Sequence, residues 1–200
     1  MVELQKKYQI GVRRFGFINY IGFKSLYIKE CQRFFVVWAQ TLLSPIVTSL
    51  LFLMVLSLSI GNFRGEVLGY PFIDFLAPGL IAMQIIQQSF SHSSSSIVIG
   101  KMQGNIVDVL YAPLSAAEVT LAIVLAATTR SIMIASISVV VFSLIIEMNF
   151  FNIFYIIIYT LLSSFILGSV GFIAGLWSEK FDQMASVTNF IIVPLSFLSG

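Results

Sequence analysis

The sequence predicts an all-α, polytopic helical membrane protein, and two observations lead to this fold class. Hydrophobic residues make up 58% of the 200 residues and charged residues only 10%, whereas a soluble domain has about 25% charged residues. The apolar residues also gather in five stretches, at about 35–60, 72–99, 119–146, 153–176 and 185–200. Because about 20 helical residues cross the hydrocarbon core, the first four stretches are long enough to span it.

Helices fit these stretches better than the strands of a closed β-barrel, which is the other architecture that crosses a bilayer. Barrel strands alternate apolar and polar residues over about ten positions, and Ile132–Ile146 does not alternate. The fourth stretch also contains Gly168, Gly171 and Gly175. Small residues at this spacing predict close packing of one spanning helix against another.

Residues 1–34 precede the first span and are expected to form a cytoplasmic N-terminal segment, with the transmembrane domain following at 35–200. Seven of the eleven Lys and Arg residues lie in this segment, and the positive-inside rule therefore places it in the cytoplasm, together with the loops at Lys101 and Lys180. Apolar and basic residues mix between Phe15 and Phe35, which predicts an amphipathic interfacial helix. A basic tail without regular structure is the alternative.

The longest polar interruption within the membrane domain, Gly100–Glu118, predicts a short helix on the cytoplasmic surface. Asn105 is placed to cap this helix, and Asp108 lies in its first turn, where negative charge is favourable. One face of the helix is predicted to carry three apolar residues, Ile106, Val109 and Leu110. Such a helix would offer a partner protein a binding surface, while a plain connecting loop is the alternative.

The same segment predicts a helix break followed by a new helix. Pro113 ends the first helix, and Ser115 with Glu118 has the spacing of a capping box for the next one. Lys101 follows a glycine but precedes Met102, so the segment lacks the Gly-x4-Gly-Lys-Ser/Thr phosphate loop. We therefore expect this chain to bind no cofactor itself, and any ATP to bind to another polypeptide.

The segment Lys101–Glu118 resembles the cytoplasmic coupling segment of ABC type-2 transporter permeases. The matching residues are Gly104, Ile106, Asp108, Leu110, Pro113, Leu114, Ser115 and Glu118, while Val107 stands where many members have Glu. Phe75–Leu80 resembles the entry to the family's second span, and Gly171–Asp182 and Asn189–Gly200 resemble its fourth-to-fifth span region. The resemblance covers nearly the whole chain.

This resemblance implies the membrane-spanning permease subunit of an ABC exporter in a bacterial inner membrane. ATP and Mg²⁺ would then bind to a separate ATPase subunit, and two permease copies, as a homodimer, would form the pathway. Because the family has a sixth span, we expect the sequence to be truncated at Gly200. The residues implied in ATPase coupling are Lys101, Gly104, Asn105, Ile106, Asp108, Leu110, Pro113 and Glu118.

Three polar residues within the spans are candidates for the transport pathway. Arg130 lies about a third of the way into the third stretch, where a charge costs a few kcal/mol. Its functional interpretation is that it faces a hydrophilic pathway or contacts a partner, either an anionic membrane lipid or a substrate head group; snorkelling or structural pairing is the alternative. His92 lies within the serine run 91–96, whose hydroxyls are expected to bond to carbonyls one turn back. Asp74 lies at the outer border of the second span, either near the exit or as a helix cap.

Other functions receive less support from the residues. An ion- or proton-coupled secondary transporter usually carries buried acidic groups near the midplane, but no Asp or Glu lies in the middle of a span. A membrane-embedded enzyme needs convergent catalytic side chains, and one histidine with one cysteine does not supply them. We therefore expect no catalytic residue, no metal site and no nucleic-acid partner, and an inactive truncated permease is the remaining alternative.

Overall fold

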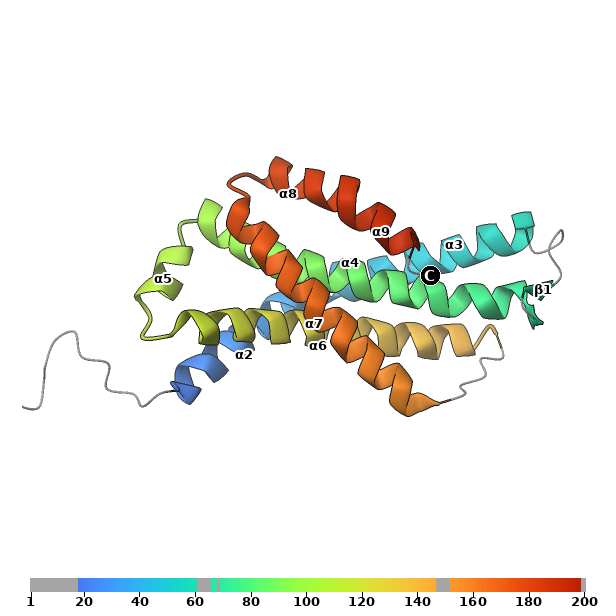
Figure 1. Ribbon diagram of the computed structural model, residues 1–200, viewed down its shortest axis with the longest axis horizontal. Coiled ribbons are helices and arrows are strands. Elements are labelled where there is room, and N and C mark those ends of the chain that lie inside the picture. Colours follow the sequence, from blue (N-terminus) through green and yellow to red (C-terminus); the bar gives the residue numbers. More distant parts are fainter. Residues whose placement is uncertain (1–17, 61–65, 68, 147–151, 199–200) are drawn as a thin grey trace, which may run out of the picture.

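The computed structural model describes residues 18–60, 66–67, 69–146 and 152–198 as an elongated helical bundle (Figure 1). The elements, in chain order, are α2 (Tyr20–Val36), the π-helix η1 (Ala39–Leu43), α3 (Ser44–Ile60), the strands β1 (Glu66–Val67) and β2 (Tyr70–Pro71), α4 (Phe72–Met102), α5 (Ile106–Tyr111), α6 (Ala116–Ser143), α7 (Ile153–Trp177), α8 (Phe181–Val187), the π-helix η2 (Thr188–Ile192) and α9 (Val193–Leu198). Apart from the two-residue strands, the elements are helices, which confirms the predicted fold class.

Four helical segments among the described residues are long and apolar enough to cross a membrane: Ala39–Ser59, Ala116–Ser143, Ile153–Trp177 and Phe181–Leu198. They match the first, third, fourth and fifth predicted spans. The second predicted span is α4, whose glutamines and serines lower its mean hydropathy. At 31 residues it is about 46 Å long. Because α3, α6 and α7 pack around it, several of its polar residues are buried: Gln84, Ser89, His92, Ser93, Ser94 and Ser96.

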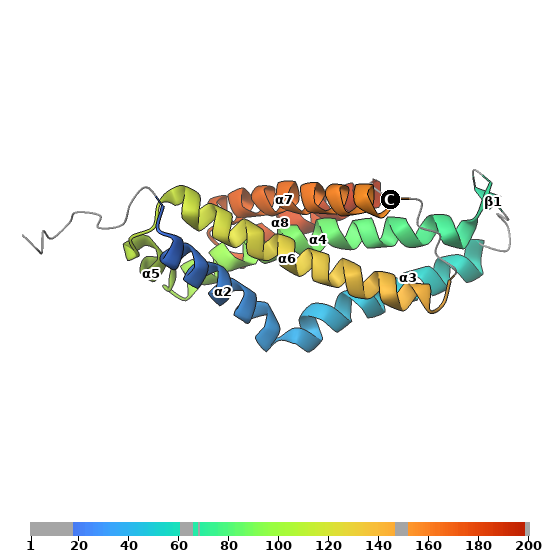
Figure 2. The same ribbon diagram turned by 90° about the horizontal axis from the view of Figure 1, so that it is seen from below.

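The long elements run alternately in opposite directions along the bundle, in the order α3, α4, α6, α7 and α8–α9 (Figure 1). Figure 2 shows α2 and α3 on one side of α4 and α6, and α7 on the other. The short helix α5 lies at the same end of the molecule as the beginning of α2, and the β1–β2 hairpin lies at the opposite end. The bundle thus separates the predicted cytoplasmic segments from the outer loops.

Two spans begin four residues away from their predicted starts. The first span begins at Ala39 rather than at 35, because α2 continues to Val36 and the chain turns before η1. The last helical segment begins at Phe181 rather than at 185, since Asp182 lies in its first turn and an acidic residue stabilises a helix N-terminus. A helix is present as α2 where the amphipathic helix was predicted. The described residues do not include 1–17, the loop with Arg64, 147–151 or 199–200.

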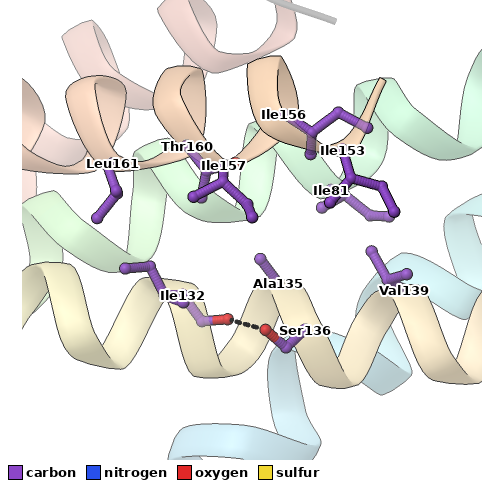
Figure 3. A pocket seen from close by; sticks show the side chains of 10 residues that line it. All are labelled: Ile81, Ile132, Ala135, Ser136, Val139, Ile153, Ile156, Ile157, Thr160 and Leu161. Atoms are coloured by element: carbon purple, nitrogen blue, oxygen red, sulfur yellow. Dashed lines mark hydrogen bonds between the residues drawn. The ribbon is translucent and has the colours of Figure 1, made fainter. Parts of the chain in front are cut away.

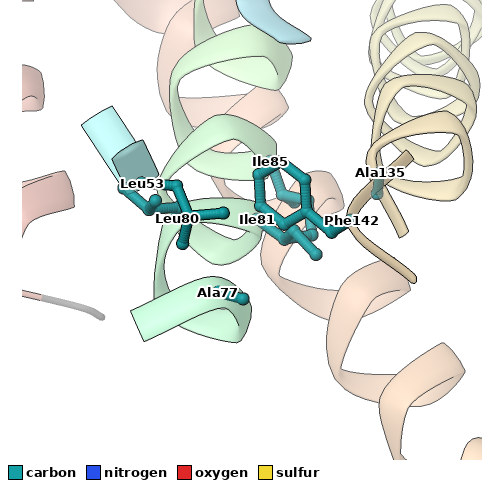
Figure 4. Close-up of a cluster of buried hydrophobic side chains, with 7 residues drawn as sticks. All are labelled: Leu53, Ala77, Leu80, Ile81, Ile85, Ala135 and Phe142. Atoms are coloured by element: carbon teal, nitrogen blue, oxygen red, sulfur yellow. The ribbon is translucent and has the colours of Figure 1, made fainter. Parts of the chain in front are cut away.

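A hydrophobic cluster joins α3, α4 and α6 in the half of the bundle away from α5 (Figure 4). Its buried members are Leu53, Ala77, Leu80, Ile81, Ile85, Ala135 and Phe142. Lipid is as apolar as these side chains, so the cluster holds the helices together by shape and van der Waals contact rather than by exclusion of water. It fixes the outer half of α4 relative to α6.

Glycines bring α7 against the polar half of α4, as the small-residue spacing predicted. A Cβ atom at Gly171 would lie 2.5 Å from the carbonyl oxygen of Phe90, and one at Gly175 would lie 2.9 Å from the carbonyl oxygen of Ser94. At Gly168 the nearest atom would be 3.4 Å away, in the side chain of Val124 on α6. The backbones of α4 and α7 therefore approach each other most closely at Gly171.

Candidate functional site

The predicted coupling helix is present as α5, and its side chains divide between the bundle and the solvent. Gly104 has φ = 76°, a backbone conformation that favours glycine, and it turns the chain after α4. Ile106 packs against an apolar cluster of α4, α6 and α7 residues, namely Ile97, Ile123, Val124 and Phe172. Val109 lines a groove beside α2. Leu110 and Tyr111 are 76% and 86% exposed. The three apolar residues share one side of α5 by their spacing, but only Ile106 and Val109 contact the bundle, while Leu110 is left exposed.

The N-terminus of α5 is not capped as predicted. Asn105 occupies the cap position but makes no side-chain capping bond, and its Nδ2 donates to Oε1 of Gln103 at 3.1 Å. Its backbone is already helical, with φ = −73° and ψ = −10°, whereas a capping residue usually has extended backbone angles. Asp108 lies in the first turn as predicted and is exposed.

Glu118 fastens the end of the coupling segment to the beginning of α2. Its Oε2 accepts from the backbone N–H of Ser115 at 2.6 Å, and its own N–H donates to Oγ of Ser115 at 3.3 Å, which confirms the predicted capping box. Its Oε1 accepts from the backbone N–H of Asn19 at 2.5 Å, and Nδ2 of Asn19 donates to the carbonyl of Pro113 at 3.2 Å. The carboxylate is buried, with 6% of the residue exposed.

Lys101 fastens the beginning of the segment to α7. Its Nζ donates to the carbonyl oxygens of Gly175, Leu176 and Ser178, at 3.0, 2.5 and 3.1 Å. A cation at this position satisfies carbonyls that the last turn of a helix leaves without partners. The coupling segment is therefore held at both ends, by Lys101 to α7 and by Glu118 to α2.

An apolar groove of about 400 Å³ separates α2 from α5 and from the turn that follows it. Ile21 and Leu26 line its α2 side, and Val109 and Leu114 line the other. Lys29 and Asp108 place one positive and one negative side chain along it. We refer to this groove together with the exposed Leu110 and Tyr111 as the coupling surface.

A second group of polar side chains lies where α2 packs against α4 and α6, and we call it the buried polar cluster. Its members are Glu30 and Arg33 of α2, Gln88, His92 and Ser96 of α4, and Arg130 of α6. Oγ of Ser96 donates to Oε2 of Glu30 at 2.8 Å, and Nη2 of Arg33 donates to the His92 carbonyl at 3.0 Å. The cluster thus joins three helices far apart in the sequence.

The structure brings two of the three pathway candidates together. Nη1 of Arg130 lies 3.4 Å from Nδ1 of His92, and its Nη2 donates to Oε1 of Gln88 at 2.8 Å. Arg130 is therefore paired within the bundle. Asp74 lies in the first turn of α4, about 27 Å along the same helix from His92, so it takes no part in the cluster and fits the helix-terminus alternative.

His92 is fully buried and has one ring nitrogen without a hydrogen bond. Its Nε2 lies 3.9 Å from Oε2 of Glu30, too far for a hydrogen bond. Ser93 and Ser94 donate to the carbonyls of Ser89 and Phe90 at 3.1 and 2.8 Å, as predicted for the serine run. Ser93 and Ser94 therefore bond within their own helix, whereas Ser96 donates to Glu30 of α2.

The ionisable side chains of α2 offer no reactive group. Burial lowers the pKa of the Arg33 guanidinium, and the nearby Glu30 carboxylate opposes this shift. Burial raises the pKa of the Cys31 thiol, which keeps it in the less nucleophilic protonated form. No group of three metal-ligating side chains occurs among the described residues.

An apolar cavity of about 410 Å³ lies between α4, α6 and α7 (Figure 3). Ile81, Ile132 and Ile157 contribute to its lining from the three helices. Oγ of Ser136 donates to the carbonyl of Ile132 at 2.8 Å, so this hydroxyl is satisfied within α6. The cavity offers space to an apolar group and no charge to bind a polar one.

Comparisons with known proteins agree with this arrangement. The family model described as "ABC-2 type transporter" matches residues 22–200. The "Inner membrane transport permease YadH" of Escherichia coli K12 is 25% identical over 183 residues, which cover 92% of this chain and 72% of the relative. Proteins of the same name in Escherichia coli O157:H7 and Shigella flexneri match to the same extent. No solved structure matches the chain.

Proposed function

Since the chain belongs to the ABC-2 type transporter family and is a membrane permease component of an ABC transporter, we propose that a separate ATPase subunit docks on its coupling surface and drives export. The observation that carries this proposal is the exposure of Leu110 and Tyr111 on α5. Large apolar side chains gathered on a water-facing surface mark a protein interaction site. The groove beside α2 continues this surface.

The two anchors of the coupling segment make it suited to transmit a movement. A displacement of α5 by the ATPase would pull on α7 through Lys101 and on α2 through Glu118, because both contacts are short hydrogen bonds to charged groups. ATP binding to the partner would then favour one arrangement of the spans over another. A ligand shifts such an equilibrium only by binding the two states differently.

The remaining parts of the assembly follow from the same proposal. ATP and Mg²⁺ bind to the ATPase subunit, and a second copy of this permease completes the pathway as a homodimer. Much of the apolar surface of α3 and α9 is exposed and is available to lipid or to the second copy. Like the relative named an inner membrane permease, the chain is a multi-pass protein of the bacterial inner membrane.

Replacing Leu110 with aspartate is expected to reduce co-purification of the ATPase subunit at least tenfold, because a charge would replace an apolar contact at the centre of the interface. Since Leu110 is 76% exposed, the permease itself should fold normally. The measurement is the ATPase-to-permease ratio after affinity purification of the permease. Leu110→Met serves as the control and should leave the ratio unchanged, whereas a normal ratio for Leu110→Asp would contradict docking at this surface.

The energy source provides a second test that separates an ABC exporter from an ion-coupled transporter. Transport by the assembled complex in vesicles should stop when ATP is removed and continue when a protonophore collapses the proton gradient. The reverse result, together with purification of the permease free of any ATPase, would contradict the proposal. It would favour the secondary transporter that the sequence left as an alternative.

A further inference from the structure

The buried polar cluster carries more positive than negative charge. Glu30 is its single carboxylate among the described residues, whereas Arg33 and Arg130 are both cationic. Oε2 of Glu30 lies 3.6 Å from Nε of Arg33, so the acidic residue of α2 pairs with the arginine of the same helix. Within the described part of the chain, no carboxylate lies within 4.0 Å of the Arg130 guanidinium.

The hydrogen bonds of Arg130 also leave it incompletely satisfied. A guanidinium has five N–H groups, and the partners found for Arg130 are the neutral amide of Gln88 and Nδ1 of His92. Its Nε is buried without any hydrogen-bond partner, as is Nε2 of His92. A buried charge is strongly disfavoured unless an opposite charge pairs with it. The site therefore lacks one anion.

The position of the cluster indicates where that anion comes from. Arg33 lies three residues before the end of α2, and the first span begins shortly afterwards at Ala39. The cluster thus lies where the predicted interfacial helix meets the spans, on the predicted cytoplasmic side. Acidic lipid head groups on the cytoplasmic side attract basic residues, and the long side chain of an arginine within a span, such as Arg130 in α6, can reach toward them.

Access to the site and the chemistry of its donors agree with such a ligand. The side chain of Arg33 is 32% exposed and Arg130 is half-buried, so the cluster is not sealed. Arginine binds phosphate with two parallel hydrogen bonds from its planar fork. Arg33 and Arg130 come from two helices and both contact His92, so together they can bind the phosphate of one head group.

We propose that Arg33 and Arg130 form a binding site for the phosphate head group of an anionic lipid in the cytoplasmic leaflet. The lipid phosphate supplies the counter-charge that Arg130 lacks within the described chain. This site is independent of the ATPase contact at α5. It is also separate from the apolar cavity of Figure 3, which α7 helps to form, whereas the cluster lies against α2.

The test compares lipids that differ in head-group charge alone. The full-length chain is purified in detergent and supplied with phosphatidylglycerol or phosphatidylcholine of identical acyl chains, and retained lipid is counted by native mass spectrometry. We expect at least fivefold preferential retention of phosphatidylglycerol. Equal retention of the two lipids by the unmodified protein would overturn the proposal without reference to any variant.

Variants locate the site. Arg130→Gln keeps a donor for Gln88 but removes the charge, and it is expected to abolish the preference, as is Arg33→Gln. Lys180→Gln removes the same charge from an exposed position outside the cluster and should retain the preference, and Arg130→Lys should retain part of it. Unchanged preference in both arginine variants would overturn the assignment.

Two further outcomes would also overturn it. If millimolar inorganic phosphate displaces the retained phosphatidylglycerol completely, the site binds a free anion rather than a lipid. If Arg130→Gln converts a dimer to a monomer and leaves lipid retention unchanged, a carboxylate of the second copy is the counter-charge. Failure of the ATPase to co-purify would leave this proposal unaffected.

Discussion

Replacement of Gly171 with alanine is expected to destabilise the protein by about 3 kcal/mol, the upper part of the usual range for overpacking. The added methyl would lie 2.5 Å from the backbone carbonyl oxygen of Phe90 and 3.0 Å from its Cα, and it would also meet Oγ of Ser93. Backbone atoms of a packed helix cannot rotate away as a flexible side chain can. Helices α4 and α7 must therefore separate, and thermal unfolding in detergent should begin at a clearly lower temperature.

Two glycines of the same helix provide matched controls for this change. Gly175→Ala places the methyl 2.9 Å from the carbonyl oxygen of Ser94, so its effect should be smaller but in the same direction. Gly168→Ala meets its nearest neighbour at 3.4 Å and gains up to about 1 kcal/mol of helix propensity; it should be neutral or slightly stabilising. Equal melting temperatures for all three variants would contradict the close approach of α7 to α4.

Replacement of Glu118 with alanine is the second change expected to have a large effect. It removes the acceptor of two backbone N–H groups, those of Asn19 and Ser115. A buried donor left without a partner costs about 1–3 kcal/mol. Because the Ser115 N–H is only partly buried, a total loss of about 2–4 kcal/mol is expected. The first turn of α2 should then exchange its amide hydrogens faster, and transport coupled to the ATPase should fall.

Hydrogen exchange and thermal unfolding together measure this effect. Glu118→Gln keeps one carbonyl oxygen as an acceptor and should lose about half as much stability. Glu179→Ala removes an exposed carboxylate and should change neither measurement. If the exchange of α2 amides in Glu118→Ala equals that of the unmodified protein, Glu118 does not fasten α2 to α6.

Features that depend on neighbouring residues in the sequence could be predicted. The apolar stretches gave the spans because a helix rises about 1.5 Å per residue and the hydrocarbon core has a fixed thickness. The capping box of Ser115 and Glu118 needs a spacing of three residues. The back-bonding of the serine run likewise uses carbonyls three or four residues earlier.

Contacts between distant segments could not be predicted in the same way. Leu110 lies four residues after Ile106, yet it faces outward, because α2 and α4 cover only part of the surface of α5. Residues 19 and 118 are 99 positions apart, and no periodicity connects them. The partners of Lys101 are backbone carbonyls, which every residue possesses, so no sequence signal could have identified them.

The sequence by itself determined the membrane location, the helical class and the family resemblance, because these follow from composition, run length and short motifs. Only the tertiary structure decided which polar groups meet. From the sequence, Arg130 was either a functional charge or one that snorkels or is paired. The packing of α2 against α4 and α6 placed it beside His92 and Gln88, and among the described residues no carboxylate pairs with it. The positive and negative side chains that meet at a buried site are set by their proximity in space, and this proximity arises only when the helices pack.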